Sequence, residues 1–76
     1  MSASYYAKVQ TAIGDVAVAV DLRTAKTLAQ VVVDNHRTKQ LHLKQVPLEW
    51  VRGHSDRVIY WTGLIDEEPV IQFESL

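Results

Sequence analysis

The chain has no cysteine, and it has little glycine, proline or continuous apolar sequence. Its 76 residues include three glycines and two prolines. Without cysteine there can be no disulfide framework and no thiolate zinc site. No segment approaches the run of about 20 apolar residues that spans a bilayer, so we expect no membrane partner. The start of the sequence lacks the basic and apolar regions of a secretory signal, so we expect a cytoplasmic protein.

The length allows one small domain, which we place at residues 1–76. A domain of this size hides only about 60% of the surface of its unfolded chain, so its stability margin is thin. Association of several copies is one common way for a small domain to gain stability. We therefore expect a homo-oligomer or a subunit of a larger complex.

Charge is unevenly distributed along the chain. The net charge of −1 argues against bulk attraction to nucleic acid or to a membrane surface. Residues 36–57 carry five cations against two carboxylates, which gives +3, and residues 58–76 carry four carboxylates and no cation, which gives −4. The basic middle and the acidic end could pair within one subunit, or between subunits.

Alternation of side chains with period two dominates the sequence and indicates β-strands. The run from Gly14 to Asp21 alternates valine with alanine after a turn-prone pair, which predicts a hairpin of strands Ser4–Ala12 and Val16–Val20. Because the second strand is apolar on both faces, we expect it to be central in its sheet. The same pattern predicts strands at Gln40–Gln45, Arg57–Ile65 and Val70–Phe73, with a bulge or bend at Gly63.

The segment between Arg23 and Asp34 fits two structures. Ala25, Leu28, Ala29 and Val32 would share one face of a helix, but Val31 to Val33 are three β-branched residues in a row, which favours a strand. With a strand at Thr27–Asp34, the sequence predicts a mostly β protein, a small closed barrel of about six short strands. The alternative is an α+β fold: a hairpin, one helix at about residues 24–36, and three strands.

Part of the chain resembles a known family of small β-barrels. The residues concerned are the run Leu28–Asp34, the corner Val46–Val51 and the stretch Asp56–Ile59. Together they resemble PRC-barrel-like domains over roughly residues 28–61, although the glycine-containing opening common in that family is absent from Leu22–Thr27. The resemblance implies a barrel that serves as a docking module, with no catalytic residues shared by the family.

The side chains able to support catalysis or bind metal do not form a recognisable motif. His36, His42 and His54 lack the close spacing of metal ligands. His54, Ser55 and Asp56 are consecutive, so they cannot relay a proton along a line as a catalytic triad does. We expect no enzyme activity, no metal and no cofactor.

Binding to a protein, or to a second copy of the chain, fits the sequence best. The basic middle contains aromatic residues of the types that anchor interfaces. The alternative is a small barrel that binds single-stranded nucleic acid, since basic and stacking side chains are interleaved in the same stretch. The residues predicted to contact the partner are Arg37, Lys39, Lys44, Trp50, Arg52, Arg57 and Tyr60.

Overall fold

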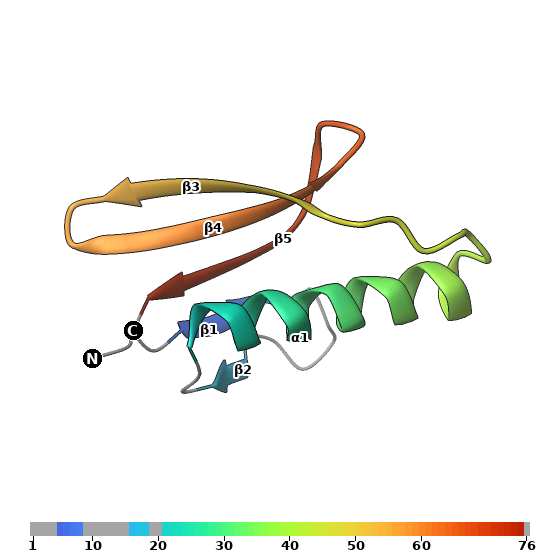
Figure 1. Ribbon diagram of the computed structural model, residues 1–76, viewed down its shortest axis with the longest axis horizontal. Coiled ribbons are helices and arrows are strands. Elements are labelled where there is room, and N and C mark those ends of the chain that lie inside the picture. Colours follow the sequence, from blue (N-terminus) through green and yellow to red (C-terminus); the bar gives the residue numbers. More distant parts are fainter. Residues whose placement is uncertain (1–4, 9–15, 19–20, 76) are drawn as a thin grey trace.

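The fold consists of one antiparallel sheet and one helix packed against it (Figure 1). The computed structural model describes residues 5–8, 16–18 and 21–75. The elements in chain order are β1 (Tyr5–Lys8), β2 (Val16–Val18), α1 (Leu22–Asn35), the π-helical segment His36–Gln40, β3 (Glu49–Ser55), β4 (Val58–Ile65) and β5 (Glu68–Ser75). The strand order is β2-β1-β5-β4-β3, and every neighbouring pair is antiparallel.

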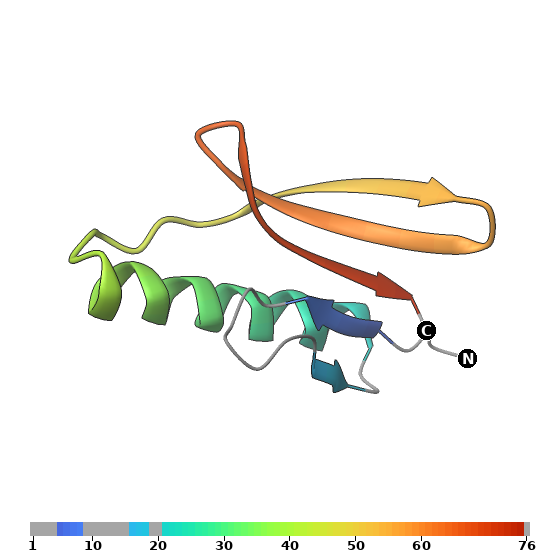
Figure 2. The same ribbon diagram turned by 180° about the vertical axis from the view of Figure 1, so that it is seen from behind.

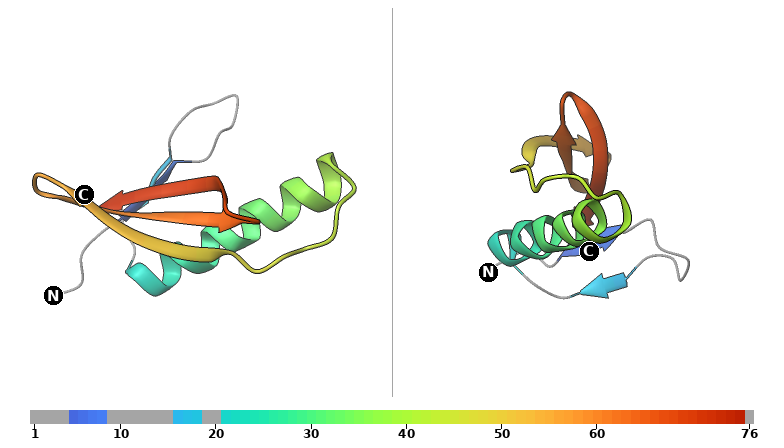
Figure 3. Two further views of the ribbon diagram at one scale, coloured as in Figure 1. Left: turned by 90° about the horizontal axis from the view of Figure 1, so that it is seen from above. Right: turned by 90° about the vertical axis from the view of Figure 1, so that its right-hand side faces the viewer.

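This is an α+β fold with an open sheet, so the predicted six-stranded closed barrel is wrong. β3, β4 and β5 form an antiparallel meander, and the β1–β2 hairpin extends it through the pairing of β1 with β5. In the described part of the chain, β2 and β3 are the two ends of the sheet and do not pair. Figure 3 shows the helix lying on one side of the strands. The alternative prediction of a hairpin, a helix and three strands is confirmed.

Residues Leu22–Asn35 form a helix where the preferred prediction was a strand. Asp21 caps the helix, because its carboxylate accepts a hydrogen bond of 2.7 Å from the backbone N–H of Thr24. Ala25, Ala29 and Val33 then recur at a spacing of four and are buried, which outweighs the strand preference of the valine run. None of the described helices is long and apolar enough to cross a membrane.

Three further expectations about the strands need correction. Val16–Val18 forms an edge strand, so it is not central, and the Gly14–Asp15 turn lies outside the described residues. Gln40–Gln45 contains no strand, because Gln40 ends the π-helical segment and His42 has a φ of 55°. Glu49–Ser55 is a strand, although the sequence suggested a corner there. The strands predicted at Arg57–Ile65 and Val70–Phe73 are confirmed and correspond to β4 and β5.

The core lies between α1 and the sheet face that it covers, as the reverse view shows (Figure 2). Phe73 on β5 is fully buried and is its centre. The ring of Tyr5 meets Phe73 edge-on at 5.4 Å between centroids, and Trp50 packs against Phe73 at 5.2 Å. The buried members are Tyr5, Ala25, Ala29, Val33, Leu48, Ile65, Ile71 and Phe73.

The bulge expected at Gly63 is confirmed by a shift in strand register. β4 and β5 pair regularly up to Gly63 and Ile71, and the register changes between Gly63 and Leu64. A Cβ at Gly63 would lie 3.0 Å from Ile71, 3.2 Å from Leu48 and 3.3 Å from Trp50. The absence of a side chain at this position therefore lets three apolar groups close over the strand.

The side chain of Gln30 ties α1 to the connection that leads into β3. Its Nε2 donates to the carbonyl of Val46 at 3.0 Å and to Oδ1 of Asp34 at 2.9 Å. Its Oε1 accepts from the backbone N–H of Leu48 at 2.9 Å. One amide thus satisfies backbone groups on both sides of Pro47, which has no N–H of its own.

The substitution Gln30→Glu should lower the free energy of unfolding by about 1–3 kcal/mol, because it removes both donors and places a carboxylate beside Asp34. Chemical denaturation followed by tryptophan fluorescence measures the change. Gln45→Glu is the matched control, since Gln45 is exposed and makes the same change of charge. Equal losses in the two variants would contradict this role for Gln30.

The turn between β4 and β5 uses two residues with positive φ, Asp66 at 51° and Glu67 at 66°. This region is unfavourable for residues with a Cβ, and hairpin turns of this kind prefer glycine. Glu67→Gly should therefore stabilise the fold by about 1 kcal/mol. Glu68→Gly, one residue further and inside β5, should destabilise it instead. Thermal melts of the two variants test this, and a loss of stability in Glu67→Gly would contradict it.

The cap of α1 predicts a dependence of stability on pH. Hydrogen bonds from the side chain and backbone of Thr24 lower the pKa of Asp21. The carboxylate therefore stabilises the fold above its unfolded pKa, and this contribution is lost as the pH falls through the lower folded pKa. Asp21→Asn keeps an acceptor but cannot titrate. Circular dichroism melts should show less acid sensitivity in this variant than in the parent, and identical acid sensitivity would contradict the assignment.

Candidate functional site

The seven residues predicted to contact a partner do not gather at one place. The first group lies after the C-terminal end of α1, and the second lies on β3 and its turn into β4. The third is a single residue on the sheet face turned away from the helix. Arg37 belongs to the π-helical segment, and the next two cations follow it along the chain. In chain order the groups are Arg37, Lys39 and Lys44; Trp50, Arg52 and Arg57; and Tyr60.

Within the group at the end of α1, the side chain of Arg37 has a structural role. The Nε of Arg37 donates to the carbonyl of Lys44 at 2.9 Å, and the carbonyl of Arg37 accepts from the N–H of Leu43 at 2.8 Å. Arg37 therefore holds the turn that reverses the chain toward β3. Lys39 and Lys44 are exposed. We find no contact that links these three cations to the aromatic residues of the sheet.

Tyr60 lies on the sheet face turned away from the helix. Its ring crosses the neighbouring strand at Gly53, and a Cβ on Gly53 would overlap that ring. Tyr60 and Gly53 are direct partners in the β3–β4 ladder. Trp50 belongs to the opposite face, where it packs on Phe73. Tyr60 and Trp50 therefore lie on opposite faces of the sheet.

The alternation of side chains separates charge between the two faces of the meander. Arg52 opposes Trp61 in the β3–β4 ladder, and His54 opposes Ile59, all on the face that α1 partly covers. The outer face carries no lysine or arginine at the described positions of these strands. Those outer positions are Glu49, Val51, Gly53 and Ser55 on β3, Val58, Tyr60, Thr62 and Leu64 on β4, and Gln72 and Glu74 on β5.

The helix-facing side brings together a cluster that we call the basic–aromatic patch: Lys26, Trp50, Arg52, His54 and Trp61. The ammonium group of Lys26 lies 4.0 Å from the centroid of the Trp61 ring and 6.0 Å from that of Trp50. Such distances are typical of cation–π contacts. The indole Nε1 of Trp61 is buried, and it has no hydrogen-bond partner among the described residues.

Sequence reasoning missed Lys26 because the residue lies far from the others along the chain. It sits on α1, 24 positions before Trp50 and 35 before Trp61, and only the packing of helix on sheet unites them. The signal that could have found it is the cap at Asp21. A helix that starts there and buries Ala25 and Ala29 places Lys26 beside the buried stripe.

The two turns of the meander lie at opposite ends of β4, and only the β4–β5 turn carries a net charge, which is negative. The β3–β4 turn contains Asp56 and Arg57 and extends past the N-terminal end of α1 (Figure 1). The β4–β5 turn contains Asp66 and Glu67. β4 has eight residues, which separates the turns by roughly 23 Å at a rise of about 3.3 Å per residue. The basic and acidic regions of the sequence therefore do not pair within one described subunit at these turns.

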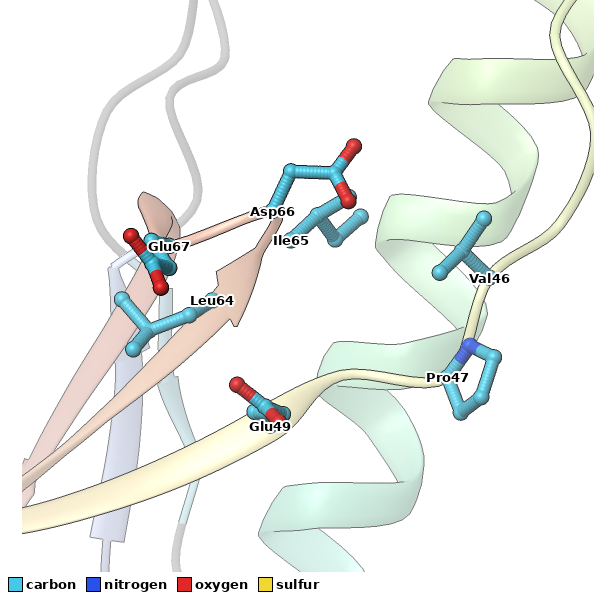
Figure 4. A pocket seen from close by; sticks show the side chains of 7 residues that line it. All are labelled: Val46, Pro47, Glu49, Leu64, Ile65, Asp66 and Glu67. Carbon is cyan, nitrogen blue, oxygen red and sulfur yellow. The ribbon is translucent and has the colours of Figure 1, made fainter.

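An open depression lies at the acidic end, beside the chain that enters β3 (Figure 4). The acidic side chains of Glu49, Asp66 and Glu67 are among the residues that line it. The described residues contain no group of three side chains suited to holding a metal ion. The full lining is Val46, Pro47, Glu49, Leu64, Ile65, Asp66 and Glu67.

β3 is the exposed edge of the meander. It pairs with β4 along all seven of its residues, and no described strand pairs with its other side. It contains no proline, no lysine and no bulge, which are devices that commonly protect edge strands from pairing with another chain. Val51, the third of its seven residues, is 51% exposed.

Comparison with known proteins does not indicate a function for this chain. No family model, no curated protein and no solved structure matches the chain. The resemblance of residues 28–61 to PRC-barrel-like domains therefore stays a prediction. The distinctive features of the described residues are the free β3 edge, the acidic β4–β5 turn and the basic–aromatic patch.

Proposed function

We propose that the chain is a non-catalytic interaction module that binds protein through the edge of β3, and that its partner is a second copy of itself. The observation that carries the proposal is that β3 combines a free edge with charge that reverses along its length. The lack of cysteine suits a reducing compartment, and we propose a cytoplasmic location. A docking role is also what the resemblance to PRC-barrel-like domains implies.

The backbone of β3 supplies the attraction. In an antiparallel ladder the residues of a strand alternate between bonding to one neighbour and pointing their N–H and C=O groups to the other side. The side of β3 away from β4 therefore presents a row of groups ready to pair with an added strand. A second β3 satisfies them symmetrically, since a two-fold interface uses the same patch on each subunit.

The charge along β3 favours antiparallel pairing of two copies. The strand begins at Glu49, beside the Asp66–Glu67 turn, and its second half carries Arg52 and His54 before the turn that holds both Asp56 and Arg57. Antiparallel pairing places the acidic end of one copy beside the basic end of the other, and the two-fold axis repeats the contact. Parallel pairing would align like charges instead.

Side-chain pairing selects one register. With Val51 at the axis, Trp50 opposes the second copy's Arg52, and Glu49 opposes the second copy's Gly53. An aromatic ring beside a guanidinium is a favourable cross-strand pair. With Arg52 at the axis, two guanidinium groups would face each other directly, which is unfavourable. The axis at Val51 also buries the most exposed large apolar side chain of the strand.

The absence of cysteine makes this register testable with a single substitution. Val51→Cys places two thiols opposite each other across the proposed axis, and cross-strand Cβ atoms about 4.5–5.5 Å apart can close to a disulfide with small shifts. After mild oxidation, non-reducing electrophoresis should show a covalent dimer of twice 8.6 kDa. Val70→Cys is the matched control, because Val70 is a similarly exposed valine on β5.

The control should stay monomeric at equal protein concentration and oxidation time. Cross-linking of the two variants to the same extent would mean random collision and would contradict the proposal. An unmodified protein that light scattering finds at 8.6 kDa up to millimolar concentration would also overturn it.

A further inference from the structure

We propose that the basic–aromatic patch of Lys26, Trp50, Arg52, His54 and Trp61 binds single-stranded nucleic acid. The patch lies on the helix-facing side of the sheet, and it is complete within one subunit. The proposal therefore does not depend on self-association through β3. Its chemistry combines side chains that pair with phosphate and side chains on which bases stack.

The cations of the patch are available to a ligand. The described residues include no carboxylate in a salt bridge with Lys26, Arg52 or Arg57. The carboxylates closest in sequence to Lys26 and Arg52 are Asp21, whose Oδ1 accepts from the N–H of Thr24, and Glu49, which is three residues before Arg52 and on the opposite face of β3. Arg52 and His54 are exposed on consecutive helix-facing positions of β3. Phosphate groups lying along this strand would meet the Arg52 guanidinium and the His54 imidazole on the same face.

The separation of charge between the two faces makes the patch attractive to phosphate although the chain has a net charge of −1. Arg52 pairs with Trp61, five residues before the acidic turn at Asp66, which is roughly 16 Å along the strand at a rise of about 3.3 Å per residue. That distance exceeds the Debye length of about 8–10 Å at physiological salt, so the acidic groups are largely screened from a ligand at the patch.

The two indole rings distinguish the patch from a site that binds negative charge alone, because bases can stack on them. Trp61 and Trp50 are half-buried, and Lys26 lies over the ring of Trp61 at 4.0 Å. A cation–π contact at such a site is weak enough to be exchanged, so Lys26 can move to a phosphate while an unpaired base approaches the indole. Bases in a duplex are already stacked, so the ligand is a single strand.

Fluorescence anisotropy of labelled oligo(dT) and oligo(U), titrated over a range of potassium chloride concentrations, tests the proposal. We expect binding that weakens steeply with salt and that quenches tryptophan fluorescence. Lys26→Gln and Arg52→Gln should each weaken binding by about 3–10-fold and reduce the slope of log affinity against log salt by about 1. Circular dichroism should show both variants folded, because neither side chain belongs to the buried core.

Lys39→Gln and Lys44→Gln are matched controls, since they remove the same charge from exposed positions beyond the C-terminal end of α1. They should change affinity by less than about twofold. Equal weakening by all four substitutions would place binding on diffuse charge and overturn the site. Equal affinity for heparin without quenching would show that the patch binds polyanions in general. Equal affinity for a poly-glutamate peptide would show that it binds acidic protein segments. Either result would overturn the proposal. Absence of binding at low salt would also overturn the proposal.

Discussion

Among the described residues, one α-helix has to cover a five-stranded sheet, and the free edge and the exposed patch both result from that mismatch in width. A helix about 10 Å wide covers about two strands spaced by about 4.8 Å. α1 lies against β1 and β5, and its buried stripe of Ala25, Ala29 and Val33 closes the core over Phe73. β4 and β3 extend beyond this cover, and Lys26 is the helical side chain that reaches their indole rings. The basic–aromatic patch is exposed, and the edge of β3 is free, because α1 does not extend over β4 and β3.

The two proposals are geometrically compatible. A two-fold axis between antiparallel edge strands is perpendicular to the sheet, so each face of one subunit continues into the same face of the other. Two basic–aromatic patches would then lie next to each other across the axis, on the side of the joined sheet that carries both helices. Arg52 would be close to the axis, opposite the second copy's Trp50. Dimerisation would therefore lengthen the surface offered to a single strand without adding a new kind of contact.

The sequence predicted the strands that have a clear period and missed the features that depend on packing. The alternation from Val58 to Ile65 and the glycine within it predicted β4 and its bulge, because side-chain period and glycine act locally. Val31–Val33 favoured a strand, but the cap at Asp21 and the burial of Val33 against the sheet made it a helix. The seven predicted contact residues fell into separate places because a run of sequence does not show which side of the sheet each side chain occupies. Lys26 became visible only when the helix was placed over Trp61.

The central claim is that the outer edge of β3 is a binding edge. Amide hydrogen exchange of the unmodified protein, measured by nuclear magnetic resonance over a range of protein concentrations, tests it most directly. In β3 the amides that point away from β4 should become protected as concentration rises, while those bonded to β4 stay protected throughout. Protection should appear symmetrically about Val51. Outward amides of β3 that exchange at the rate of exposed backbone at every concentration would contradict the account.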